Sequence, residues 1–168
     1  MDLKILTKLS YGIYVVCSKH KEIYNGQIAN VVFQTSAEPP TITVSINKQN
    51  LTYELIENSK VFTVSILSQD TPMIFIGRFG FQGGRNIDKI KDIQSKIGIT
   101  GAPVVLENGI GYLEAEVINT MDVFTHTLFL GKIVNAEIIR EAQPMTYDYY
   151  HTVLKAKSPK TAPTYMKE

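Results

Sequence analysis

The sequence predicts a mainly β protein, a closed or partly closed antiparallel barrel with short interrupting helices. Three observations predict this class. Strand-length runs of β-branched and apolar residues recur along the chain, turn residues separate them, and no regular alternation of strands with long helices is present. With 168 residues, 44% of them hydrophobic, the chain is long enough for one domain with a sizeable core.

The first predicted strand follows a short helix. Residues 3–9 place three leucines at roughly helical spacing, and the β-branched run from Ile13 to Val16 then predicts a buried strand. The next apolar stretch covers residues 28–33. Because the polar residues 19–22 and the turn-prone pair Asn25-Gly26 stand between the two stretches, we expect a hairpin.

The segment 41–46 alternates strictly between hydroxyl and aliphatic side chains, which predicts a strand with one solvent-exposed face and one buried face. Asn50 is a capping-type residue, and the apolar stripe after it predicts a helix of about two turns that ends near Ser59. Residues 61–67 predict another strand of alternating character.

The second half of the chain begins with residues 71–100, whose pattern indicates short helices and loops. Two long β-rich stretches, 112–117 and 126–139, then predict an antiparallel pair with its turn at residues 119–122. From Ser158 the chain is short, polar and proline-bearing, with little left to pack. We expect one domain over residues 1–157 and a linker-like tail over residues 158–168.

Charge and composition exclude several classes of function. Seventeen basic and sixteen acidic residues leave a formal charge of +1, too little for a broad nucleic-acid surface. No apolar run approaches the ~20 residues of a membrane span, and no signal peptide is recognisable, so we expect no membrane contact and a cytoplasmic location. One cysteine and three scattered histidines give no metal-ligand spacing. Redox chemistry would therefore need a bound cofactor.

Three segments could bind a cofactor that carries a phosphate and a planar ring. Residues 48–52 join a strand end to a helix start, where free backbone amides and the helix dipole favour phosphate. Residues 25–30 offer a glycine, an alanine and three amide side chains to a heterocycle. The loop 83–89 could add cations that bind phosphate. Helix capping, a hairpin turn and a solvated loop are the plainer interpretations, and all remain open.

His126 lies among apolar residues in a strand-like run, where a lone histidine is more often structural than catalytic.

Six motifs, read in order, resemble the flavin reductase-like family, and most closely the flavin domain of the fusion proteins called high-molecular-weight rubredoxins. The resemblance covers nearly the whole chain. The motifs are Ser10–Val16, Tyr24–Asn30, Asn47–Thr52, Phe79–Phe81, Thr125–Phe129 and Pro159–Tyr165.

The resemblance implies a Greek-key split β-barrel with short peripheral helices, a homodimer with FMN near its interface, and hydride transfer from NADH or NADPH to the flavin. Electrons would pass to flavin or to a separate protein acceptor such as a rubredoxin or a flavodiiron protein. A ferric reductase and a non-enzymatic FMN carrier or sensor are the alternatives. Because no Gly-x-Gly-x-x-Gly motif is present, the nicotinamide would stack transiently on the flavin.

The resemblance also implies roles for particular residues. The flavin ring would lie along residues 25–30, the phosphate at residues 47–52, and the catalytic His126 near the nicotinamide. No metal ligand is implied. The cofactor-binding residues would be Asn25, Gly26, Gln27, Ile28, Ala29, Asn30, Asn47, Lys48, Asn50, Thr52, Gly84 and Arg85.

Overall fold

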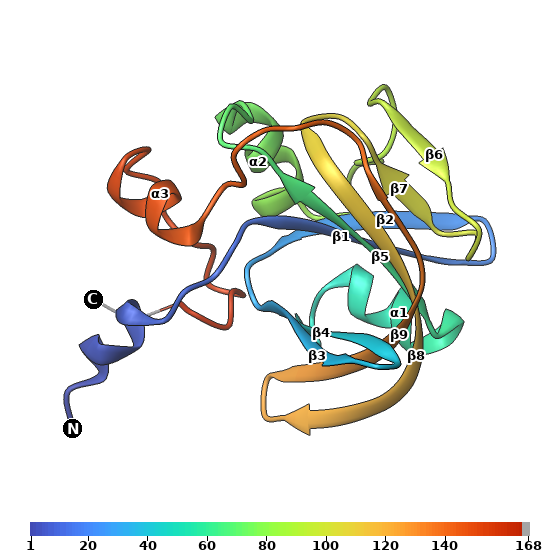
Figure 1. Ribbon diagram of the computed structural model, residues 1–168, viewed down its shortest axis with the longest axis horizontal. Coiled ribbons are helices and arrows are strands. Elements are labelled where there is room, and N and C mark those ends of the chain that lie inside the picture. Colours follow the sequence, from blue (N-terminus) through green and yellow to red (C-terminus); the bar gives the residue numbers. More distant parts are fainter. Residues whose placement is uncertain (166–168) are drawn as a thin grey trace.

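The computed structural model describes residues 1–165. Seven antiparallel strands form one strongly curved sheet in the order β2-β1-β5-β8-β9-β4-β3, and two short strands pair separately (Figure 1). The predicted mainly β barrel is therefore confirmed. The strands are β1 (Tyr14–His20), β2 (Ile23–Ala29), β3 (Val32–Ala37), β4 (Pro40–Asn47), β5 (Val61–Leu67), β6 (Ser95–Ile97), β7 (Pro103–Val105), β8 (Gly109–Val123) and β9 (His126–Ile138).

Four short helices accompany the sheet in the described part of the chain. They are the 3-10 helix η1 (Leu3–Lys8) and the α-helices α1 (Leu51–Ser59), α2 (Met73–Gly80) and α3 (Tyr147–Thr152). Asn50 precedes α1 as predicted. Every residue of η1 is exposed, so this helix contributes nothing to the core. Within the described part of the chain, no helix is both long and apolar enough to cross a membrane.

Two apolar clusters stabilise the fold, one inside the barrel and one between the sheet and α2. Strand β1 separates them, because successive side chains on a strand point to opposite faces. Val16 therefore packs inside the barrel, whereas Val15 and Cys17 face α2. The interior cluster comprises Val16, Ala29, Ile42, Val44, Ile46, Ile56, Phe62, Val64, Ala115 and Phe129.

The expected hairpin is present, since β1 and β2 pair antiparallel, but the interpretation of Asn25-Gly26 as its turn is wrong. Both residues lie inside β2, where they pair with Ser18 and Cys17. The chain turns earlier, at Lys21, whose φ of 54° provides the left-handed conformation of the turn. Gly26 instead lets β2 pack closely against the Cys17 side chain of β1, because a Cβ atom at position 26 would lie 2.6 Å from the Cys17 sulfur.

The expected turn at residues 119–122 is also wrong, because β8 continues through them to Val123. The chain reverses at Phe124, which has a φ of 52°.

The predicted solvent-exposed face of the strand over residues 41–46 is likewise absent. Thr41, Thr43 and Ser45 are all buried, because other parts of the fold lie against this face: Thr41 Oγ1 is 2.8 Å from Thr35 Oγ1 on β3, and Ser45 lines a cavity.

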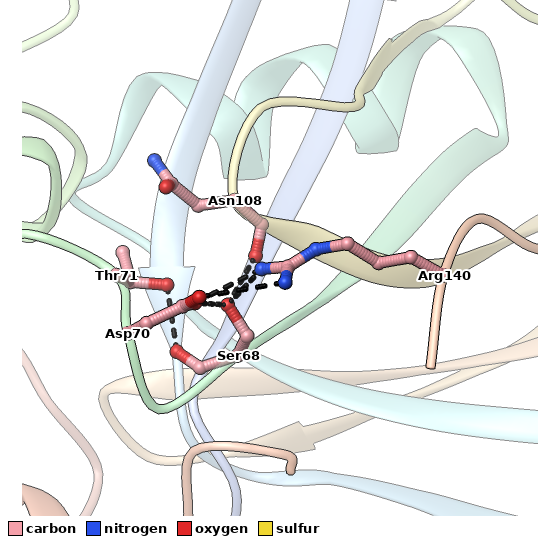
Figure 2. Close-up of polar contacts among 5 residues, drawn as sticks. All are labelled: Ser68, Asp70, Thr71, Asn108 and Arg140. Atoms are coloured by element: carbon pink, nitrogen blue, oxygen red, sulfur yellow. Dashed lines mark hydrogen bonds and ion pairs between the residues drawn. The ribbon is translucent and has the colours of Figure 1, made fainter. Parts of the chain in front are cut away.

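A polar cluster fixes the route of the chain after β9 (Figure 2). Arg140 donates to Ser68 Oγ at 2.6 Å and to Asp70 Oδ1 at 2.9 Å, and Ser68 Oγ also donates to the carbonyl of Asn108. Thr71 Oγ1 donates back to the Ser68 carbonyl at 2.7 Å. The connection toward α3 is thus fastened to the end of β5 before the tail begins.

Candidate functional site

A cavity of about 700 Å³ opens where β2, the end of β4 and the start of α1 meet. The end of α2 with the loop after it forms a second side, and residues 157–163 with Tyr165 form a third. Its volume lies in the range of cavities that hold small molecules and cofactors.

Nine of the thirteen predicted site residues line this cavity. Of the other four, Gly26 and Thr52 belong to the elements that line it, and Lys48 and His126 lie outside its lining. Residues far apart in the sequence are therefore brought together around one space. The nine are Asn25, Gln27, Ile28, Ala29, Asn30, Asn47, Asn50, Gly84 and Arg85.

The amino end of α1 is open toward the cavity. The side chain of Asn50 makes no capping hydrogen bond to the helix, and its Nδ2 atom donates to Gln27 Oε1 at 3.1 Å. Gln49, Asn50 and Leu51 line the cavity at this end. The amides of the first helical turn, with the positive end of the helix dipole, therefore favour a phosphate there.

Asn25 connects β2 to α1 and keeps one free acceptor. Its Nδ2 atom donates to Thr52 Oγ1 at 2.8 Å, and both residues are buried. Its Oδ1 atom is buried without a hydrogen-bond partner. Gly84 packs directly against this amide, and a Cβ atom at position 84 would collide with it. A buried acceptor at a cavity wall is suited to a ligand donor, since leaving it unpaired costs free energy.

The two cations predicted to anchor the phosphate are both paired with carboxylates. Lys48 Nζ lies 3.2 Å from Asp122 Oδ1, and Arg85 makes a two-pronged contact with Glu54. The hydroxyl of Thr127, followed by Lys48, lowers the pKa of Asp122. Neither cation is free for a ligand in this arrangement.

Lys89 is the buried cation of the cavity. The residue is 4% exposed and its Nζ atom donates to the Phe79 carbonyl at 3.1 Å. Burial lowers its pKa to about 8, although the nearby Cys17 thiol opposes this shift. Within residues 1–165 no carboxylate pairs with it. A buried ammonium group without a counter-ion is costly, so the site favours an anionic ligand.

The sequence predicts phosphate-binding cations in the loop 83–89, which contains Lys89, but the cation of that loop named among the cofactor-binding residues is Arg85. A sequence pattern does not show which residue of a loop is buried. Sequence reasoning also missed the tyrosines of α3, Tyr147 and Tyr150, which line the cavity. Their aromatic spacing resembles an ordinary amphipathic helix, so no sequence signal could have identified them.

His126 lies at the start of β9, directly opposite Asn47 on β4. Its Nε2 atom is 3.1 Å from the carbonyl of Thr161, which can only accept, so Nε2 carries the proton. Thr125 Oγ1 lies 2.8 Å from Nδ1. Burial lowers the pKa of His126, and the Thr161 carbonyl partly offsets this effect. The ring is therefore uncharged at neutral pH and acts as a hydrogen-bond donor.

These features define a class of protein: an antiparallel barrel with a site for a planar ring that carries a phosphate. The amide side chains of β2 suit the heterocycle, and the open helix end with Lys89 suits the phosphate. Within the described residues, no group of His, Cys, Asp and Glu side chains could hold a metal ion.

The sequence profile of the flavin reductase like domain matches residues 6–156. The chain therefore belongs to the flavin reductase-like family and is a flavin-dependent oxidoreductase. The predicted family, split-barrel fold, flavin cofactor and reductase class are thus confirmed.

Two relatives match nearly the whole chain. The chain is 45% identical to a high molecular weight rubredoxin of Moorella thermoacetica over 98% of its own length and 72% of the relative. It is 43% identical to a ferric-chelate reductase (NAD(P)H) of Archaeoglobus fulgidus over 98% of both chains. Among solved structures, an FMN-binding protein from Thermus thermophilus superposes with a TM-score of 0.72 and 25% identity, covering 78% of this chain and 72% of that one.

Proposed function

We propose that the protein binds FMN in the cavity described above, accepts hydride from NADH or NADPH, and delivers electrons to free flavin or to a protein acceptor. One observation carries the proposal: the open amino end of α1 and the buried Lys89 border the same cavity as the amide-rich strand β2. When bound, FMN supplies a ring that takes up hydride and passes electrons on.

The chain's own residues have distinct parts in this proposal. The Asn25 Oδ1 atom, which is buried and unpaired, would accept from the bound cofactor. The first-turn amides of α1 would bind the phosphate, with Lys89 as its counter-ion. Ile28 and Ala29 would provide an apolar surface for the ring. His126, with its proton on Nε2, would hydrogen-bond to the nicotinamide of the incoming donor.

The direct test is anaerobic reduction of the FMN-loaded protein by NADH and by NADPH, followed through the loss of flavin absorbance. Rapid bleaching by either nucleotide supports an enzyme. Stable yellow colour with both would favour the non-enzymatic carrier or sensor, and failure to bind FMN at all would refute the cofactor assignment.

The identity of the acceptor is a separate question. Similarity to a rubredoxin fusion protein favours a rubredoxin as a separate partner, and a flavodiiron protein is a related candidate. Similarity to a ferric-chelate reductase over the full length of both chains favours chelated iron as a second candidate acceptor. Steady-state rates with purified rubredoxin, a flavodiiron protein, ferric chelates and free FMN, each under the same donor concentration, separate these functions.

We also propose that the protein is a homodimer. The leucines of the N-terminal segment support this, because Leu3, Leu6 and Leu9 are each about half exposed and η1 buries none of its residues. Phe124, at the β8–β9 turn, is 96% exposed. Apolar groups of this size commonly become covered in an assembly. Sedimentation of the FMN-loaded protein as a monomer at micromolar concentration would contradict the proposal.

A further inference from the structure

The chain after α3 turns back toward the sheet (Figure 1), and residues 157–163 with Tyr165 line the cavity. Its first anchor is a single carbonyl. Thr161 O accepts from Asn47 Nδ2 at 3.2 Å and from His126 Nε2 at 3.1 Å. Both donors belong to the sheet, and the carbonyl occupies the proton-bearing nitrogen of His126. This atom is therefore not free for another ligand while the contact lasts.

The second anchor is the hydroxyl of Thr164. It accepts from Asn30 Nδ2 at 2.6 Å and lies 2.8 Å from the hydroxyl of Tyr147. The same tyrosine hydroxyl lies 2.7 Å from Ser158 Oγ. Residues 158–165, which we call the strap, are thus tied to three polar side chains of the site: Asn30, Asn47 and His126.

The strap is held by polar contacts rather than by the core. Leu154 and Ala156 still pack against the cluster under α2, whereas within residues 158–165 none contributes to either apolar cluster and none is buried. Each of these hydrogen bonds joins a buried side chain to a half-buried residue of the strap, and both groups can bond to water once the strap opens. A segment with few apolar contacts and such bonds opens locally at low free energy.

We propose that the strap closes the donor side of the flavin cavity and that NADH or NADPH must displace it to reach the flavin. This proposal rests on the proposed function and names a regulation of that same site. The donor binds only the open form, so its apparent affinity is reduced by the fraction of molecules that are open. Any change that weakens the strap should therefore help the donor.

The first experiment weakens one anchor in the full chain. Thr164→Val removes the hydroxyl that accepts from Asn30 but keeps the side-chain shape, and Thr164→Ser keeps the hydroxyl as a matched control. We expect Thr164→Val to increase the rate of anaerobic flavin reduction about three- to fivefold at low donor concentration, the change for one net hydrogen bond. The limiting rate at saturating donor should stay unchanged, and Thr164→Ser should behave as the unmodified protein.

An unchanged or reduced rate for Thr164→Val at low donor concentration would overturn the strap proposal, while bleaching of the unmodified protein would leave the proposed function intact. Conversely, a protein that holds FMN but is bleached by neither nucleotide would refute the proposed function.

The second experiment needs no variant. Lys160 is exposed and lies within the strap, so trypsin can cleave after it when the strap opens. Addition of NADP⁺ or NAD⁺ to the FMN-loaded protein displaces the strap without allowing chemistry, and we expect cleavage after Lys160 to accelerate severalfold. Slower or unchanged cleavage with both nucleotides would show that the strap stays closed beside the donor, and would overturn the proposal even if no variant folds.

Discussion

Two walls of the same cavity are built in different ways. The wall of β2 and α1 is fixed by pairing with β1 and by the buried hydrogen bond between Asn25 and Thr52. The opposite wall, the strap over residues 158–165, has no buried residue and is held by hydrogen bonds from the side chains of Asn30, Asn47 and His126. If the proposed function holds, the rigid wall would bind the cofactor, and the strap would move when the electron donor enters and leaves.

The largest expected effect tests the apolar core that supports the first wall, because Phe62 on β5 belongs to the same cluster as Ala29 of β2 and Ile56 of α1. Phe62 is fully buried inside the barrel, so Phe62→Ala should lower the free energy of unfolding by about 3–5 kcal/mol. In the strap, Pro163 is exposed, so Pro163→Ala should change stability by less than about 0.5 kcal/mol. Urea unfolding followed by circular dichroism measures both. A comparable loss in the two variants would mean that the strap is part of the cooperative core.

The second prediction concerns the phosphate end of the rigid wall. Lys89→Met removes the buried charge while keeping a similar shape, and it should weaken FMN binding about ten- to a hundredfold. Riboflavin, which lacks the phosphate, should bind with unchanged affinity. Because the buried ammonium group has no carboxylate partner among residues 1–165, the variant without flavin should be at least as stable as the unmodified protein.

Fluorescence titrations with FMN and riboflavin measure these affinities, and Lys91→Met is the matched control, since Lys91 is an exposed lysine on the same loop. Equal weakening of FMN and riboflavin would place Lys89 at the ring rather than at the phosphate.

The sequence predicts the rigid wall better than the movable one. Alternating strands and the start of α1 follow local patterns, so the helix at Asn50 and the strand Val61–Leu67 appear where expected. The turn at Asn25-Gly26 fails because tertiary packing overrides a local turn signal: Gly26 is needed beneath Phe79 and beside Cys17. The strand predicted over residues 112–117 is longer than expected for a similar reason. Pairing with β9 continues β8 through the polar residues 119–122.

The contacts of the tail could not be predicted from composition. A polar segment with two prolines is typical of a linker, and its hydrogen bonds to Asn30, Asn47 and His126 join residues more than thirty positions apart. Such contacts depend on where the fold brings the chain, not on local propensity. The partition into a domain over residues 1–157 and a linker-like tail therefore stays a prediction.

The third prediction uses the pH dependence of FMN binding. Lys89 has a pKa of about 8 in the flavin-free protein, and a bound phosphate should raise it. The complex then holds more protons above pH 8, so FMN affinity should change little between pH 7 and pH 8 and fall by up to about tenfold per pH unit above pH 8. The phosphate is already dianionic there. The facing Cys17 thiol stays neutral because burial raises its pKa to about 12.

Isothermal titrations between pH 7 and pH 9.5 measure this effect, with riboflavin as the reference ligand. An FMN affinity that does not change with pH would contradict this prediction. An equal fall in riboflavin affinity would mean that the pH dependence does not come from the contact between the phosphate and Lys89.

The smallest expected effect concerns Lys48, which the sequence pattern places at the phosphate and the structure pairs with Asp122 at 3.2 Å. The two side chains are 33% and 74% exposed, and ion pairs that water reaches contribute about 1 kcal/mol or less. If this pairing persists when FMN binds, Lys48→Met should weaken FMN binding by less than about fivefold. A loss of tenfold or more that disappears with riboflavin would mean that Lys48 leaves Asp122 and reaches the phosphate. In that case Asp122→Asn should strengthen FMN binding, because it releases the lysine, and the rigid wall would contain one movable cation at its edge.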